Sequence, residues 1–221
     1  FRVGLWEGGR FEWLPEGWAR EVGYEEDTLV TRIVWTHAGR GLRVAFSDAV
    51  DFHEDVFVRK VTVSDAAGRP RLLRLFFGFD FSVSGNDIGD TAALRPEAGC
   101  LVHYKHDRYF LINASLGGRV GFDQYAMGNK NRQGFAGTWK DAEDGSLGGN
   151  PIAQGSVDSV AALHVTVEAG GSESAWLWIA AGCGWAEAQA LNRDIVKRGA
   201  ARLLQRTADY WRLWATKEPG A

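Results

Sequence analysis

The chain has 221 residues, of which 45% are hydrophobic and 24% charged, and this composition is that of an ordinary globular protein. The formal net charge of -3, without any cluster of Lys and Arg, argues against a nucleic-acid partner. No apolar run approaches the ~18–20 residues of a transmembrane helix, so we expect no membrane partner.

The first part of the chain reads as short strands separated by turns. Phe1–Leu14 predicts two strands joined at Gly8-Gly9, a dipeptide that accepts the positive φ angles of tight hairpin turns. Pro15–Asp27 is polar and irregular, so we expect a loop there. Alternating apolar residues predict the next strands at Thr28–Thr36 (with Leu29, Ile33 and Trp35 on one face), Leu42–Phe52 and Val56–Val63.

The strongest strand signal lies at Arg71–Val83, which reads RLLRLFFGFDFSV. An alternating aromatic and aliphatic run of this kind suits a pleated, half-buried surface. The residues that share its apolar face are Leu73, Leu75, Phe77, Phe79 and Phe81.

Shorter strands follow, and they decide the predicted fold class. After the polar loop Ser84–Asp90, strands are expected at Thr91–Pro96, Cys100–Tyr104, Tyr109–Ala114 and Val120–Tyr125. Near the end of the β region, Ser159–Glu168 and Ser174–Ala181 predict a final hairpin. Many short strands without intervening helices indicate a β-sandwich or barrel, and about a dozen strands favour two packed antiparallel sheets.

The stretch Gly137–Ser159 has no apolar periodicity, and a loop of this length is usually functional or disordered. Its own apolar residues, such as Trp139, favour an ordered working loop. Trp139 either offers a flat face to a sugar ring or a neighbouring domain, or folds inward as an anchor. The polar candidates for sugar hydroxyls or a domain contact are Asp141, Glu143, Asp144, Asn150, Gln154 and Asp158.

The last part of the chain predicts an amphipathic helix over Trp185–Thr216, bent or split at Gly199. Its apolar face either packs back on the sandwich or awaits another part of the protein, and we favour the second alternative. The candidate docking residues are Tyr210, Trp211 and Trp214.

Other motifs carry little chemistry. The acidic run Asp141–Gly145 lacks the spacing of an EF-hand and Gly148-Gly149 does not form a phosphate loop, so we expect neither a metal nor a cofactor. No G-x-S-x-G is present, and His103 is expected to be structural. The two cysteines, Cys100 and Cys183, could pair, although two buried free thiols are the favoured interpretation.

An ordered series of motifs resembles a known family. The motifs are GDTA (89–92), HYKHDRYF (103–110), GTWKDAEDG (137–145), NPIAQGSVDS (150–159) and LNRDIVKRG…LLQRTADYWRLW (191–214). Together they resemble the N-terminal non-catalytic domain of prokaryotic glucoamylase-type enzymes, glycoside hydrolase family 15. The resemblance covers nearly the whole chain but lacks the family's first few tens of residues. Because the sequence begins at Phe1 without Met, we expect a fragment or processed form.

The resemblance implies an all-β fold, an antiparallel two-sheet supersandwich of the galactose-mutarotase type with a C-terminal helical linker. It divides the chain into a supersandwich at 1–184 and a linker at 185–221 that leads to an α/α-barrel catalytic domain outside these residues. In the family that barrel carries the two catalytic glutamates of an inverting hydrolase. We therefore expect no catalytic residue in this chain.

The implied function is to stabilise the barrel, with the loop at 137–159 shaping its substrate entrance. The alternative is an autonomous carbohydrate-binding module that takes α-glucan on exposed aromatics. The substrate of the parent enzyme stays open among starch-type glucans, dextran and trehalose. Its location stays open as well, with the cytoplasm favoured over secretion.

Overall fold

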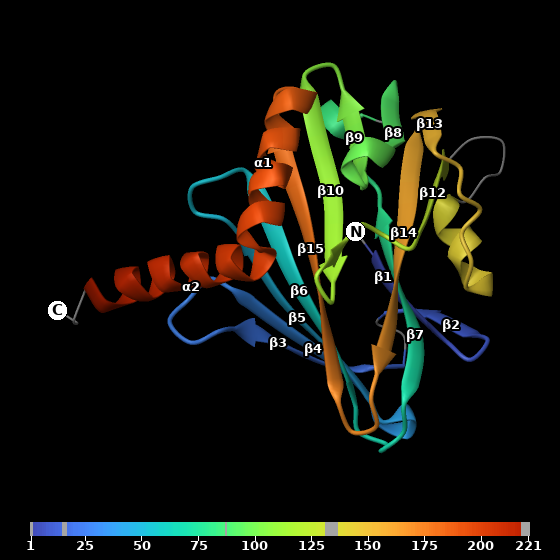
Figure 1. Ribbon diagram of the computed structural model, residues 1–221, viewed down its shortest axis with the longest axis vertical. Coiled ribbons are helices and arrows are strands. Elements are labelled where there is room, and N and C mark those ends of the chain that lie inside the picture. Colours follow the sequence, from blue (N-terminus) through green and yellow to red (C-terminus); the bar gives the residue numbers. More distant parts are fainter. Residues whose placement is uncertain (1, 15–16, 87, 131–136, 218–221) are drawn as a thin grey trace.

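The computed structural model describes residues 2–14, 17–86, 88–130 and 137–217, and it consists of two antiparallel sheets packed face to face. Two helices lie on the outer side of the larger sheet, and the 3-10 helix η4 (Thr138–Asp144) lies on the outer side of the smaller one (Figure 1). The fold predicted from the sequence is therefore confirmed.

The smaller sheet has five strands in the part of the chain that the structure describes. In spatial order they are β12 (Gln124–Asn129), β14 (Val157–Val167), β7 (Arg71–Phe79), β1 (Arg2–Glu7) and β2 (Arg10–Trp13). As predicted, β1 and β2 form a hairpin around Gly8-Gly9, where both glycines have positive φ angles.

Within the described ranges, the larger sheet has ten strands. In spatial order they are β13 (Ile152–Gly155), β8 (Asp90–Arg95), β9 (Cys100–Lys105), β10 (Arg108–Leu116), β15 (Ser172–Gly182), β6 (Val56–Asp65), β5 (Leu42–Val50), β4 (Thr31–His37) and β3 (Ala19–Tyr24), with β11 (Arg119–Val120) paired to β10. The other 3-10 helices are η1 (Ala38–Arg40), η2 (Val83–Gly85) and η3 (Pro96–Ala98).

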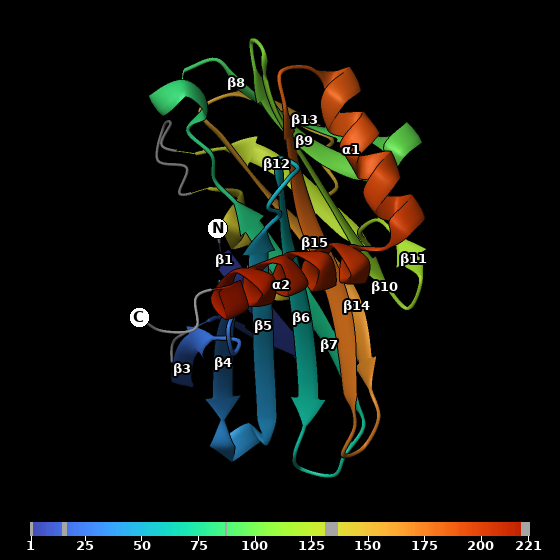
Figure 2. The same ribbon diagram turned by 90° about the vertical axis from the view of Figure 1, so that its left-hand side faces the viewer.

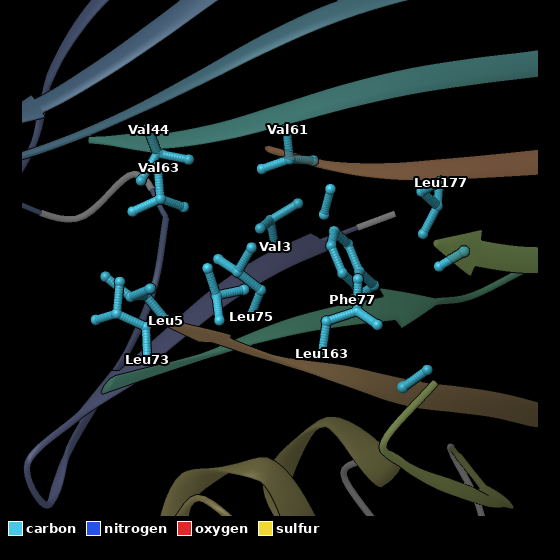
Figure 3. Close-up of a cluster of buried hydrophobic side chains, with 14 of the residues drawn as sticks. Val3, Leu5, Val44, Val61, Val63, Leu73, Leu75, Phe77, Leu163 and Leu177 are labelled. Atoms are coloured by element: carbon cyan, nitrogen blue, oxygen red, sulfur yellow. The ribbon is translucent and has the colours of Figure 1, made fainter. Parts of the chain in front are cut away.

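The main core lies between the sheets, and β7 supplies its centre. The predicted face of this strand is buried at Leu73, Leu75, Phe77 and Phe79, and Phe81 packs against the same cluster. Side chains from both sheets meet there, including Val61 and Val63 from β6 and Leu163 from β14 (Figure 3).

Two strand predictions are wrong. Residues 15–27 contain β3, which pairs with β4 at the edge of the large sheet. All six residues of β3 are exposed, so the strand has no buried face to produce an apolar alternation. Conversely, Leu29 lies outside β4 and is exposed.

The predicted final hairpin is also wrong. β14 pairs with β7 and β12 in the small sheet, whereas β15 pairs with β10 and β6 in the large one. The short glycine-containing turn between them, closed by a hydrogen bond from Gly171 N to Glu168 O (2.8 Å), therefore crosses from one sheet to the other.

The C-terminal residues form α1 (Trp185–Arg198) and α2 (Ala200–Lys217), and they separate at Gly199 as predicted. Gly199 has a φ of 88°, a backbone conformation that favours glycine. Ile195 of α1 and Leu203 and Leu204 of α2 are buried against the outer face of the large sheet, which α2 crosses (Figure 2). The alternative that we favoured from the sequence is thus wrong for most of the helical segment, because its apolar face packs back on the sandwich.

Neither cysteine is in a disulfide. Cys100 is buried, and burial raises the pKa of its thiol to about 12. Cys183 is exposed, so the expectation of two buried thiols is wrong for this residue. Among the helices of the described residues, none is long and apolar enough to span a bilayer.

A candidate docking groove at the end of the last helix

The second half of α2 runs beyond the surface that covers its first half. Thr207 and Ala208 are still buried, but every residue from Leu213 to Lys217 is exposed. Trp214 exposes 58% of its surface and Leu213 exposes 64%. Large apolar side chains that gather on one exposed surface commonly mark an interaction site.

Asp51 fixes the direction of α2. Its buried carboxylate accepts hydrogen bonds from Arg206 Nε (2.9 Å) and Nη2 (2.7 Å) and from Thr207 Oγ1 (2.9 Å). The backbone N–H groups of His53 and Glu54 donate to the same carboxylate. Although burial raises the pKa of Asp51, the hydrogen bonds from Arg206, the backbone and Thr207 outweigh it and lower the pKa below its ordinary value.

We expect Asp51→Asn to loosen α2 without unfolding the sandwich. The change removes the charge that holds Arg206, and a hydrogen bond to a charged group contributes about 1.5–3 kcal/mol. Hydrogen exchange should accelerate in α2 by a factor of ten or more and stay unchanged in β7. The control Asp209→Asn removes an exposed carboxylate on α2, whose partners among the described residues are Gln205 and Arg212 of the same helix. Equal exchange in both variants would contradict the role of Asp51.

Tyr210 is already occupied within the domain. Its ring stacks on Phe52, with the ring centroids 4.2 Å apart and the planes at 4°. The guanidinium of Arg206 also lies over Phe52, 5.7 Å from the centroid of its ring. Of the three predicted docking residues, Tyr210 therefore supports the helix.

Trp211 and Trp214 line an open groove with a volume of about 720 Å³. Its opposite wall is the tip of the β3–β4 hairpin, where Tyr24 exposes 65% and Leu29 exposes 55% of their surfaces. Three consecutive acidic residues form the rim: Glu25, Glu26 and Asp27. The groove thus offers aromatic faces bordered by carboxylates, a surface suited to binding. The hairpin wall was not predicted from the sequence, although the acidic run between Tyr24 and Leu29 is typical of a turn.

The loop at 137–159 is ordered but is less irregular than predicted, because it contains η4, β13 and the start of β14. Trp139 is half-buried in a small cluster on the outer face of the small sheet, where it packs with Phe76 and Val160. The guanidinium of Arg2 lies 5.4 Å from the Trp139 ring centroid. Of its two interpretations, the inward anchor is the one that the structure shows.

Three of the predicted polar residues brace this loop. Asp158 is buried and accepts two hydrogen bonds of 2.9 Å from Thr138 N, which fixes the start of η4. Asp141 accepts a hydrogen bond from Gly148 N (2.7 Å). Asn150 Nδ2 donates to Met127 O (2.7 Å).

The remaining candidates lie on the surface. Glu143 and Gln154 are exposed, and exposed Asp144 accepts a hydrogen bond from Ser146 N (2.8 Å). The loop lies on the opposite side of the sandwich from α2 (Figure 1), so the predicted residues form two separate groups. Within the described ranges, no group of three or more His, Cys, Asp or Glu side chains is arranged to hold a metal ion.

Comparison with known proteins identifies the fold. No protein-family model matches the sequence, and no curated protein matches it at a significant level. The structure is similar to a bacterial glucoamylase solved in complex with acarbose, with a TM-score of 0.76 and 12% sequence identity over 96% of this chain. The predicted resemblance in fold is confirmed.

A second neighbour is a protein from the human microbiome assigned as a kojibiose phosphorylase, with a TM-score of 0.56 and 8% identity over 95% of this chain. The chain spans only 31% of the glucoamylase chain and 27% of the phosphorylase chain. Its similarity to both is therefore that of one structural unit to part of a longer protein.

Proposed function

We propose that this chain is the non-catalytic N-terminal domain of a family-15 glycoside hydrolase of the glucoamylase or α-glucosidase kind. Residues 1–184 would form the supersandwich, and residues 185–221 would lead to an α/α-barrel that holds the catalytic glutamates. The observation that carries this proposal is the fold match to 31% of a glucoamylase chain over nearly all of this one. The function of the domain would be to stabilise the barrel.

The groove beside Trp214 supports this role. A Trp ring that is mostly exposed on a rigid, anchored helix gains free energy when another surface covers it. Its neighbours Trp211, Tyr24 and Leu29 would be covered by the same contact. We infer that the catalytic domain docks here, with Tyr210 and Phe52 supporting the helix from beneath.

The role of the loop at 137–159 in the substrate entrance stays a prediction. Trp139 and Asp158 serve the loop itself, so any contact with the barrel or its substrate would fall to the exposed candidates Asp141, Glu143, Asp144, Asn150 and Gln154.

Trp214→Ala should weaken docking in the full-length natural chain. Buried Trp residues at the centre of an interface commonly contribute 2 kcal/mol or more, so about thirtyfold of the docking equilibrium should be lost. Scanning calorimetry should show one coupled unfolding transition in the parent and two separated transitions in the variant.

Leu72→Ala is the matched control, because Leu72 is also an exposed apolar residue but lies on β7, outside the groove. It should behave like the parent. A single unchanged transition in Trp214→Ala would refute docking at the groove.

A carbohydrate-binding module is the second candidate, and the groove is the observation that favours it. Aromatic faces of Tyr24 and Trp214 beside Glu25 could stack on a sugar ring and bind its hydroxyls. Titrating residues 1–221 with maltooligosaccharides and with trehalose, while following Trp fluorescence, separates the two functions. The docking function predicts no saturable change, and a saturable change lost in Trp214→Ala would favour the binding module.

A further inference from the structure

The hairpin tip that forms one wall of the groove is held rigidly. Thr28 N and Thr28 Oγ1 donate to Glu25 O (3.1 and 2.9 Å), and Glu25 N donates to Val30 O (2.9 Å). Val30 N donates in turn to Thr28 Oγ1 (3.1 Å). These bonds close the turn and display its side chains in one arrangement.

Asp27 occupies this turn in an unfavourable conformation. Its φ is 56°, which is in the left-handed region that non-glycine residues rarely adopt. Ser84 and His106 adopt the same conformation elsewhere in the domain, and Asp tolerates it better than most residues. A glycine would relieve the strain but would remove one carboxylate from the rim.

The rim differs from three buried carboxylates elsewhere in the domain. Asp48, Asp51 and Asp65 each pair with an arginine at 2.5–2.7 Å. Among the described residues, no Lys or Arg forms an ion pair with Glu25, Glu26 or Asp27. Within the described part of the chain, three adjacent negative charges therefore have no ion-pair partner beside an apolar surface.

A partner that covers this groove has to compensate the charges of the rim carboxylates. A partner that buries Trp214 also takes the half-buried Glu25 and its neighbour Glu26 out of water. Burying a carboxylate without a positive partner is strongly unfavourable. A purely apolar surface would thus lose at the rim much of what it gains at the tryptophans, whereas a surface with cations would not.

We propose that the surface which fills the groove is apolar at its centre and carries Lys or Arg side chains that pair with Glu25 and Glu26. This inference rests on the proposed function, since the occupant is the catalytic domain of the same chain. The apolar centre supplies most of the binding energy, and the charges select the partner and its orientation.

The test compares two double variants in the full-length natural chain. Glu25→Gln/Glu26→Gln neutralises the rim and leaves the turn at Asp27 and Thr28 intact. The control, Glu97→Gln/Glu168→Gln, removes the same number of charges from exposed positions outside the groove. The coupling of the two unfolding transitions is measured by calorimetry at low and high NaCl.

In the parent and the control, raising NaCl from about 0.05 to 0.5 M should separate the transitions. Added salt shortens the Debye length, which is about 8 Å at 0.15 M, and so weakens the ion pairs between the rim and the catalytic domain. In the rim variant, the transitions should be separated by several degrees already at low salt and should respond little to added salt.

The outcomes distinguish this inference from the proposed function. If Trp214→Ala separates the transitions and the rim variant matches the control, the basic partner is refuted and docking stands. If neither variant separates them, both are refuted. Separation in the rim variant together with loss of its salt response supports the inference.

Discussion

Arg71→Ala should lower the free energy of unfolding by about 3–5 kcal/mol, the usual effect of removing one partner of a buried ion pair. Arg71 is only 1% exposed at the start of β7. Its Nε and Nη2 donate to Asp65 Oδ1 (2.8 and 2.6 Å), and its Nη1 donates to Glu7 Oε1 (3.0 Å). Since Glu7 lies in the small sheet and Asp65 in the large one, Arg71 links the two sheets at one end.

The carboxylates around Arg71 are held in their charged form. Hydrogen bonds from Gly170 N, Arg71 and other backbone N–H groups lower the pKa of Asp65 well below its usual value, against the effect of burial. Burial raises the pKa of Glu7, but the hydrogen bonds from Arg40 and Arg71 outweigh it and lower the pKa. Without Arg71, Glu7 would keep Arg40, whereas the buried carboxylate of Asp65 would keep its backbone hydrogen bonds and lose its ion pair.

The control is Arg69→Ala. The side chain of Arg69 is 58% exposed and lies 3.8 Å from Glu7, so its loss should change stability by less than about 1 kcal/mol. Urea unfolding of residues 1–221 measures both variants. Equal losses for Arg69 and Arg71 would contradict the account of this network.

The domain should lose about 2 kcal/mol of stability between pH 7 and pH 5 through His103 alone. Burial, with a smaller effect from the charge of Lys130, lowers the pKa of His103 from 6.5 to about 3. The folded state therefore keeps the ring neutral while the unfolded state binds a proton below pH 6.5. Stability is full above pH 6.5 and falls as the pH drops, until the folded pKa is reached.

The structure explains why this ring stays neutral. His103 lies on β9 of the large sheet, and its Nε2 is 2.7 Å from Ser159 Oγ on β14 of the small one. The ring also meets Phe81 edge to face, with centroids 5.0 Å apart. A proton on this buried ring would carry a charge away from water.

His103→Gln should remove most of the pH dependence between pH 7 and pH 5, whatever its effect on stability at pH 7. His164→Gln replaces an exposed histidine on β14 and should keep the dependence. Urea unfolding at several pH values measures the slope. Retention of the full slope in His103→Gln would show that another group binds the proton.

The sequence predicted the sandwich because one-sided burial leaves a clear pattern. Leu73, Leu75 and Phe77 of β7 alternate since the small sheet faces the core on that side. By contrast, β3 is an exposed edge strand whose residues need no alternation. The turn before Ser172 looks the same whether its strands pair or belong to opposite sheets, so pairing could not be predicted locally.

The candidate site was only half predictable. Trp211 and Trp214 stand out on a helix because a long amphipathic segment shows its apolar face directly. The facing wall comes from residues 24–29, at the other end of the chain, and only the fold brings the two together. The anchoring role of Asp51 was equally hidden, since a single Asp in a turn has no distinctive sequence pattern.

The polar loop at 137–159 was predicted to present binding groups, but several of these side chains hold the loop itself. Asp141, Asn150 and Asp158 resemble ligand-binding groups in sequence, yet their partners are backbone groups of the loop and of its neighbours β12 and η4. Gly-rich segments that lie over a sheet need such side chains to satisfy their own backbone N–H and C=O groups.

The most direct test of the central claim is glucose release from maltose, isomaltose and trehalose, measured for residues 1–221 and for the full-length natural chain. We expect residues 1–221 to release no glucose and the full-length chain to hydrolyse at least one of these sugars, which would also name the substrate class. Glucose release by residues 1–221 alone would place a catalytic carboxylate pair within the sandwich and contradict the proposed function.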